Sequence, residues 1–200
     1  MKKTLAAAAL LAAPLLALAA PEPWSIDASH STTSFSVKHL VVSRVRGEFG
    51  KTSGTIALDP ADPARSKVEA TIDATTVNTR EPKRDEHLKS ADFLDVAKYP
   101  SITFRSTKVA AKGKDHLAVT GELTLHGVTR PVTLDVTASP EVKGMYGETR
   151  RAYTATARIE RKDFGLTWNK AIEAGPVIGD QVDISIDVEA VKDVPKTAAR

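Results

Sequence analysis

The chain has 200 residues, no cysteine, and 28 basic against 25 acidic residues, a formal net charge of +3. A charge this small argues against a nucleic-acid partner, which normally needs a concentrated basic face. Without cysteines there is no disulfide framework and no thiol nucleophile, so an apolar core alone must hold the fold.

The first 19 residues have the features of a secretory signal peptide. Lys2 and Lys3 precede a Leu/Ala-rich run that ends in Ala17-Leu18-Ala19, the small-x-small pattern of a cleavage site. At about 15 residues, the run is shorter than the roughly 20 that a spanning helix needs, which makes a membrane anchor the weaker alternative. We therefore expect cleavage after Ala19 and export to the periplasm. Two lysines leave with the leader, so the mature charge is about +1.

Most of the remaining chain alternates apolar and polar residues with a period of two, as strands with one buried face do. The clearest case is the segment 117–136, in which two alternating runs meet at His126-Gly127 and predict a β-hairpin. Other segments, among them 59–63, 112–115 and Gly175-Pro176, have the composition of places where a strand cannot continue. We predict strands near residues 34–41, 44–49, 53–58, 67–77, 101–110, 116–126, 131–139, 150–161 and 181–191.

Eight or nine strands can close a small antiparallel barrel, which leaves no sheet edge exposed. The sequence therefore predicts an all-β fold, an extended eight-stranded barrel in one domain over residues 20–193, followed by a disordered tail at 194–200. One helical excursion near residues 79–96 interrupts the strand pattern, with a short helix from Arg84 to Lys89 and a turn capped by Ser90. Such short elements must dock on the sheet, where this one would cover a mouth of the barrel.

No local motif supports catalysis or metal binding. The five histidines fall on different predicted elements without ligand spacing, and no Gly-x-Ser-x-Gly sequence is present. We therefore predict no catalytic residue and no metal, although a triad assembled by the fold stays open. The histidines are His30, His39, His87, His116 and His126.

The inward faces of the predicted strands mix large and small apolar residues. An eight-stranded barrel is close to the width at which the interior either fills or holds one slender ligand. Small inward residues favour open space, although they can equally oppose large ones. His39 continues the face of Phe35 and Val37 and would place one polar group in the cavity. The candidate tunnel residues are Phe35, Val37, His39, Ala70, Ile72, Leu88, Phe93, Phe104, Gly121, Leu123, Leu134, Ala155, Ala157 and Ile184, and the polar candidates at the mouth are Arg80, Arg84, Asp85 and His87.

Five spaced motifs stand in chain order between about Trp24 and Val191. They are His30-Ser31 with Phe35-x-Val37-x-His39; Thr79-x5-Asp85-x-His87-Leu88-x-Ser90-x-Asp92-Phe93; Tyr99-Pro100-x-Ile102-x-Phe104; Gly121-x-Leu123-Thr124-Leu125-His126-Gly127-Val128-Thr129-x-Pro131-Val132; and Arg161-x-Asp163-Phe164-Gly165. Together they resemble the YceI-like family of polyisoprenoid-binding proteins. The resemblance implies a lipocalin-like barrel whose elongated pore holds a polyisoprenoid or similar amphiphile, in secreted bacterial proteins. The chain is not a lipocalin proper, because Trp24 lacks the Gly-x-Trp context of that family.

From the pattern and the resemblance together, we expect a periplasmic protein that binds, sequesters or transports an isoprenoid such as a quinone or its precursor. No cofactor is expected beyond such a lipid. The expected partner is an amphiphilic lipid rather than nucleic acid, membrane contact is at most transient, and a homodimer is left open. Two other classes remain: an enzyme acting on an isoprenoid or small substrate through His39, His87 or Asp85, and a stress-induced structural protein with a filled core.

Overall fold

The structure, a computed structural model, describes residues 19–40, 42–173 and 175–194. The predicted signal peptide lies outside these residues except for Ala19, and the predicted disordered tail lies outside them except for Val194. Both therefore remain predictions. Within the described ranges, no helix combines the length and the apolar character needed to cross a bilayer.

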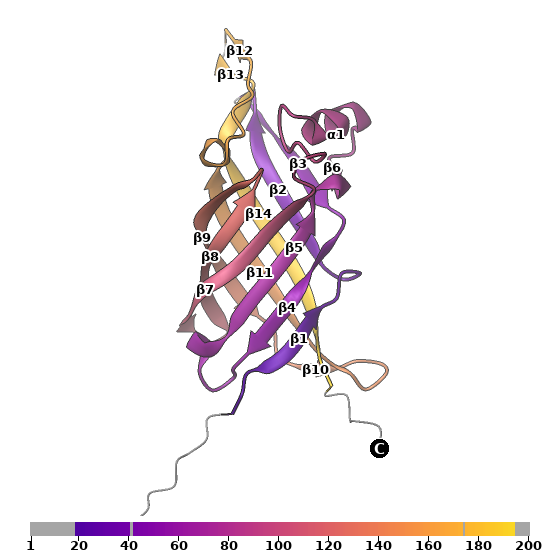
Figure 1. The fold of residues 1–200 in the computed structure, drawn as a ribbon, viewed down its shortest axis with the longest axis vertical. Helices are drawn as coiled ribbons and strands as arrows, with labels where there is room; N and C mark the ends of the chain where they lie inside the picture. The colour runs from indigo at the N-terminus through magenta and orange to yellow at the C-terminus, as the bar shows by residue number, and fades with distance from the viewer. Residues whose placement is uncertain (1–18, 41, 174, 195–200) are drawn as a thin grey trace, which may run out of the picture.

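The described chain is built almost entirely of strands, with one α-helix and three 3-10 turns (Figure 1). The strands are β1 Glu22–Ile26, β2 Thr32–His39, β3 Ser43–Phe49, β4 Thr52–Leu58, β5 Lys67–Asp73, β6 Val77–Asn78, β7 Ser101–Gly113, β8 His116–Leu125, β9 Val128–Ala138, β10 Val142–Lys143, β11 Thr149–Glu160, β12 Ala171–Ile172, β13 Gly175–Pro176 and β14 Ile178–Lys192; the helices are η1 Pro63–Arg65, η2 Ala74–Thr76, α1 Pro82–Lys89 and η3 Arg161–Phe164.

The main sheet closes on itself. Its order is β10-β11-β9-β8-β7-β5-β4-β1-β14-β2-β3-β6, and a long antiparallel pairing of β11 with β14 joins the two sides. β14 pairs with β11 along one edge, and along the other it pairs first with β2 and then with β1. The predicted all-β, eight-stranded antiparallel barrel is confirmed.

The barrel counts as eight-stranded because three positions in its wall are each occupied by two shorter strands: β1 with β2, β3 with β4, and β5 with β6. β1 and β2 both run antiparallel to β14, and β3 and β4 follow them as their neighbours. β5 and β6 pair in turn with β4 and β3. The break between β5 and β6 is η2, where the Asp73 carboxylate accepts from the Thr75 amide at 3.0 Å and caps the turn. This local cap is why the single strand expected over 67–77 does not form.

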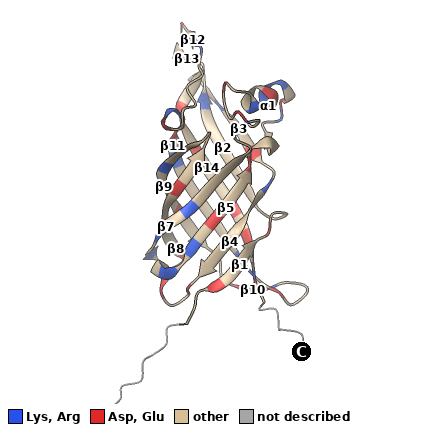
Figure 2. Cartoon of the chain, viewed as in Figure 1, with Lys and Arg blue, Asp and Glu red and all other residues tan. Residues whose placement is uncertain are grey.

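The hairpin of β8 and β9 forms as the alternation predicts. Its two-residue turn places His126 at φ +52 and Gly127 at φ +72, the left-handed pair that matches the twist of a tight hairpin. Leu123 is buried on the inner face while Glu122 is exposed on the outer one. Lysine, arginine, aspartate and glutamate are scattered along the strands of the barrel rather than gathered at one place (Figure 2).

Two further expectations about strands were wrong. β1 was not predicted, because its five residues are too few for alternation alone to identify a strand. Gly175-Pro176 was expected to end a strand, but it forms β13 and pairs with β12. A two-stranded ladder can accept Pro176 because the missing amide donor faces outward from an edge.

The helical excursion is present where it was predicted, and α1 begins two residues earlier than expected. Pro82 occupies the first turn, where its missing amide costs nothing, and the Glu81 side chain accepts from the Lys83 amide at 3.0 Å. The chain then turns back through the Ser90 carbonyl, which accepts from the Phe93 amide at 3.0 Å. In this way α1 and the residues after it come to lie over one end of the barrel (Figure 1).

Candidate ligand-binding cavity

An apolar cavity of about 430 Å³ runs inside the barrel. Its wall is almost wholly aliphatic and aromatic, with side chains from strands all around the ring. Two wall residues, Ile178 and Val188, lie ten residues apart on β14, which corresponds to about 33 Å at roughly 3.3 Å per residue. The cavity is therefore long and narrow.

All but two of the predicted tunnel residues line this cavity. Those that do are Phe35, Val37, His39, Ala70, Ile72, Leu88, Phe93, Phe104, Leu123, Leu134, Ala155 and Ile184. The structure corrects the other two positions. A Cβ at Gly121 would lie 2.5 Å from both Phe104 Cζ and the Arg105 carbonyl oxygen, so the Phe104 ring already fills that space. Ala157, which pairs with Ile184 across β11 and β14, borders a second hollow that shares Phe35 and Ile184 with the cavity.

Part of the inner wall remains uncovered by protein. Phe35, Val37, Val182 and Ile184 point inward and line the cavity, yet each is only half-buried. A side chain that points inward and still has accessible surface faces open space rather than a packed neighbour. This observation argues against the filled-core alternative.

Trp24 fills one end of the barrel, which we call the closed end. Its side chain is 0% exposed and packs in a cluster with Ile26, Leu58 and Ala190. Beyond it, Lys192 Nζ lies 5.7 Å from the indole centroid and 2.7 Å from a Glu22 carboxylate oxygen. At the closed end, the Trp24 indole is therefore covered by the Lys192–Glu22 ion pair.

Tyr153 lines the cavity close to this closed end. Burial raises the pKa of its hydroxyl. The phenol therefore keeps its proton at neutral pH, and it adds no charge to the tunnel.

The opposite end is framed by α1 with the residues after it and by the loop that follows η3. Three aromatic rings meet there: the His87 centroid lies 4.9 Å from Phe93 and 4.8 Å from Trp168, and the latter two are 5.1 Å apart. All three line the cavity. We call this end the mouth.

Trp168 was missed from the sequence, and so was the residue that positions it. Arg161 is 3% exposed; its Nη1 donates to the Trp168 carbonyl at 2.9 Å and its Nη2 to Asp180 Oδ1 at 3.1 Å. The guanidinium thus ties the loop carrying Trp168 to the start of β14. Trp168 lies in an irregular segment where no alternation marks the inward side. The only available signal was the Arg161-x-Asp163-Phe164-Gly165 motif.

The polar candidates at the mouth are mostly engaged in holding the excursion together. Arg84 donates to Thr79 Oγ1 at 2.7 Å and to the Thr79 carbonyl at 2.8 Å, and Asp85 Oδ1 accepts from the Thr79 amide at 2.8 Å. His87 Nε2 lies 2.9 Å from Asp92 Oδ2. Only Arg84 and His87 line the cavity, while Asp85 does not, and Arg80 is exposed outside it.

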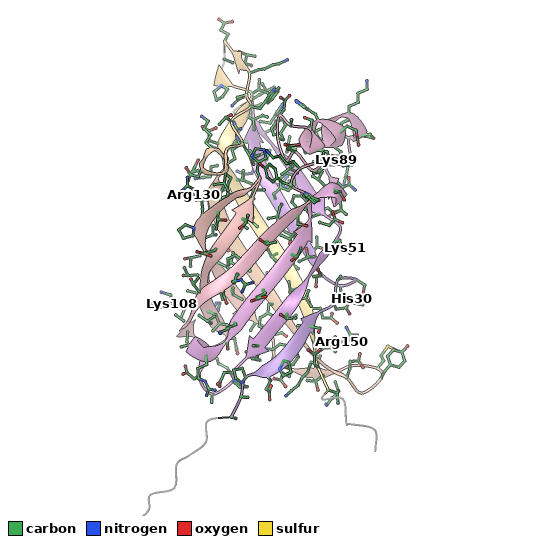
Figure 3. All side chains as sticks on the ribbon, viewed as in Figure 1. His30, Lys51, Lys89, Lys108, Arg130 and Arg150 are labelled. Carbon is green, nitrogen blue, oxygen red and sulfur yellow. The ribbon has the colours of Figure 1, made fainter. Side chains whose placement is uncertain are left out.

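A cluster of Asp27, His30 and Glu189 at the closed end brings three possible metal ligands within 4.8 Å of one another. Sequence spacing did not predict it, because Glu189 is distant along the chain. Arg150 lies among the same groups: its Nη1 is 2.9 Å from Asp27 Oδ2 and also forms an ion pair with Glu189. His30 and Arg150 are labelled in Figure 3. A guanidinium therefore supplies the positive charge that these carboxylates require.

This ion cluster should make stability depend on pH. Hydrogen bonds from Ser29, then His30 and Arg150, hold the pKa of Asp27 well below its usual range. A depressed carboxylate pKa stabilises the fold above the unfolded pKa of about 4, and the benefit disappears as the pH falls. We expect Asp27→Asn to lower the free energy of unfolding at pH 7, and the difference from wild type to shrink toward pH 2. Urea unfolding at both pH values would measure it; a difference that stays constant would contradict the linkage.

Comparisons with known proteins agree with this architecture. A family model described as the YceI-like domain matches residues 24–190. A UPF0312 protein of Vibrio parahaemolyticus is 38% identical over 197 residues, covering 96% of this chain and 100% of that protein. Protein YceI of Escherichia coli O157:H7 is 40% identical over 166 residues, covering 83% and 84%. A solved polyisoprenoid binding domain from Saccharophagus degradans, implicated in plant cell wall breakdown, matches with a TM-score of 0.62 and covers 85% and 98%; at 19% identity this likeness shows the fold alone.

Proposed function

Because the chain belongs to the YceI-like family, we propose that it binds a polyisoprenoid or similar long-chain amphiphile in its barrel cavity and sequesters or carries that lipid in the periplasm. The observation that carries the proposal is the cavity itself: long, apolar, bordered at one end by residues of the Trp24 cluster and framed by aromatic rings at the other. Its shape suits a chain-like ligand better than a compact one. The Saccharophagus degradans domain, which shares the fold, is a polyisoprenoid binding domain and supports the same proposal.

Apolar burial alone supplies enough affinity for such a ligand. An isoprene unit has five carbons, worth about 4 kcal/mol at roughly 0.8 kcal/mol per carbon withdrawn from water. A few units therefore offset the estimated association cost of about 4 to 15 kcal/mol. No polar recognition of the tail is needed.

Three hydroxyl groups of the wall are hydrogen-bonded within the protein, whereas the buried hydroxyl of Tyr153, another wall residue, has no hydrogen-bond partner among the described residues. Thr33 and Thr52, both buried and both lining the cavity, share a hydrogen bond of 3.0 Å between their hydroxyls. Ser66, another wall residue, accepts from the Asp59 amide at 2.9 Å. A hydrocarbon passing these positions leaves no hydrogen bond broken, which is what a tunnel for isoprenoid tails requires.

Binding without turnover fits the chemistry of the mouth. The two excursion residues considered for catalysis, Asp85 and His87, are engaged with Thr79 and Asp92. We therefore propose a protein that carries or sequesters lipid rather than an enzyme, with the twelve cavity-lining candidates and Trp168 as the ligand contacts.

Mass spectrometry of an organic extract tests the proposal directly. The full chain is expressed with its leader, purified without detergent from the periplasm and extracted. We expect a stoichiometric lipid whose masses differ by isoprene units, and an intact protein mass that begins at Ala20. An extract with no lipid, or with phospholipid in its place, would refute the isoprenoid assignment, and recovery with the membrane fraction as an uncleaved chain would refute the periplasmic one.

A further inference from the structure

Two exposed aliphatic side chains stand at the mouth end of the barrel. Val42, in the turn between β2 and β3, is 84% exposed, and Ile172, in β12, is 47% exposed. The hairpin of β12 and β13 projects beyond the barrel at the end that carries α1, opposite β10 (Figure 1). Both side chains therefore lie at the extremity of the molecule on the side of the mouth.

The two turns are joined to each other and to the cavity wall. The Leu40 amide donates to the Val177 carbonyl at 2.9 Å, and His39 pairs with Ile178 across β2 and β14. His39, Val177 and Ile178 all line the cavity. Val42 and Ile172, which we call the apolar tips, thus extend the apolar surface of the cavity wall beyond the mouth.

Local structure does not account for apolar residues at these tips. Exposed turns normally carry Gly, Pro, Asn, Asp or Ser, which suit turn geometry and remain hydrated. The β2–β3 turn instead carries Leu40 at φ +52, a left-handed conformation that bulky side chains rarely adopt, and then the exposed Val42. Aliphatic side chains kept in water beside a binding cavity are typical of an interaction surface.

The charges around the tips suit a phospholipid surface. Lys38 and Lys170 are exposed near them, and Lys170 Nζ lies 6.0 Å from the Trp168 centroid at the mouth. Of the nearby acids, Asp180 pairs with Lys162 at 2.7 Å, while Glu173, next to Ile172 in the same hairpin, is exposed, so the cations outnumber the acids without excluding them. Cations beside protruding aliphatic residues are the combination that binds peripheral proteins to bilayers with anionic headgroups.

A second exposed apolar group lies at the closed end, in the loop from β10 to β11. Met145 and Tyr146 are each 92% exposed there. A membrane contact through this loop would hold the mouth away from the bilayer, because the loop lies at the opposite end of the barrel from α1 (Figure 1). Met145 and Tyr146 therefore provide a control: two exposed apolar side chains at the end of the barrel opposite the mouth.

We infer that Val42 and Ile172 form a membrane-docking edge, which holds the mouth against a phospholipid bilayer while a lipid passes between the bilayer and the cavity. The inference rests on the proposed function, because a lipid that resides in a bilayer reaches the tunnel without crossing water only if the mouth touches the bilayer.

The test compares two double variants of the full mature chain, Val42→Ser/Ile172→Ser and Met145→Ser/Tyr146→Ser. Each is sedimented with vesicles of phosphatidylcholine and phosphatidylglycerol, and its binding of farnesol is measured separately without vesicles. We expect the mouth variant to lose at least about tenfold in vesicle partitioning, since two aliphatic side chains no longer enter the bilayer. The closed-end variant should stay within about twofold of wild type, and both should bind farnesol normally.

Three results would overturn the docking edge: vesicle binding of the mouth variant equal to wild type, a loss confined to the closed-end variant, or no vesicle binding by wild type. The proposed function fails separately. If no form of the protein binds farnesol while the mouth variant alone loses vesicle binding, the docking edge stands and the isoprenoid assignment does not.

Discussion

Leu123→Asp is expected to lower the free energy of unfolding by about 3 to 5 kcal/mol, a large part of the total stability of a domain this size. Leu123 is buried on the inner face of β8, where the pairing strand β7 brings Phe104 opposite it. A carboxylate there has no cation or donor to compensate for the loss of water. Urea unfolding at neutral pH would measure the loss.

The matched control is Thr133→Asp, on the exposed outer face of the adjoining β9, where we expect a change within about 0.5 kcal/mol. Ile184→Asp provides an intermediate case. Ile184 points inward but is half-buried against the open cavity, so water entering the tunnel can solvate part of the charge. Equal losses at Leu123 and Thr133 would mean that the inner and outer faces are wrongly assigned.

Filling the tunnel should abolish lipid binding with little effect on stability. Val37 and Ala70 both line the cavity and are half-buried, one on β2 and the other on β5. In Val37→Phe/Ala70→Phe, the added rings enter open space, so we expect farnesol affinity to fall at least about tenfold. The melting temperature should change by only a few degrees, whereas each insertion into a packed core would cost about 1 to 3 kcal/mol.

The control for added aromatic volume is Thr71→Phe/Thr154→Phe, on exposed outward positions of β5 and β11. It should bind farnesol as wild type does. A large drop in melting temperature for the inward pair, with farnesol affinity unchanged, would show that the interior is packed and that lipid binds elsewhere.

The barrel could be predicted because alternation is a local property of the chain. Each long strand shows its inner face within its own residues, as Leu123 and Glu122 do, so the closed sheet follows once every face needs a common interior. β1 was missed for the same reason, since five residues carry too little alternation.

The two ends of the cavity could not be predicted in this way. Trp168 reaches the mouth because Arg161 holds its carbonyl, and Asp85 is engaged because Thr79 lies beside it. Both facts depend on which loops the closed barrel brings together. Gly121 failed as a tunnel position because the ring that fills its space, Phe104, belongs to the neighbouring strand.

The pairing of β14 determines when the tunnel comes into existence. This strand, the last in the described chain, joins β11 on one side and the chain's first two strands on the other. Until β14 has paired on both sides, the sheet is unclosed and has no enclosed interior. Ring closure then joins partners from opposite ends of the sequence, a non-local step that is slow compared with hairpin formation. The cavity therefore forms only when β14 joins the sheet, and the lipid of the proposed function would be taken up by the closed barrel rather than by the folding chain.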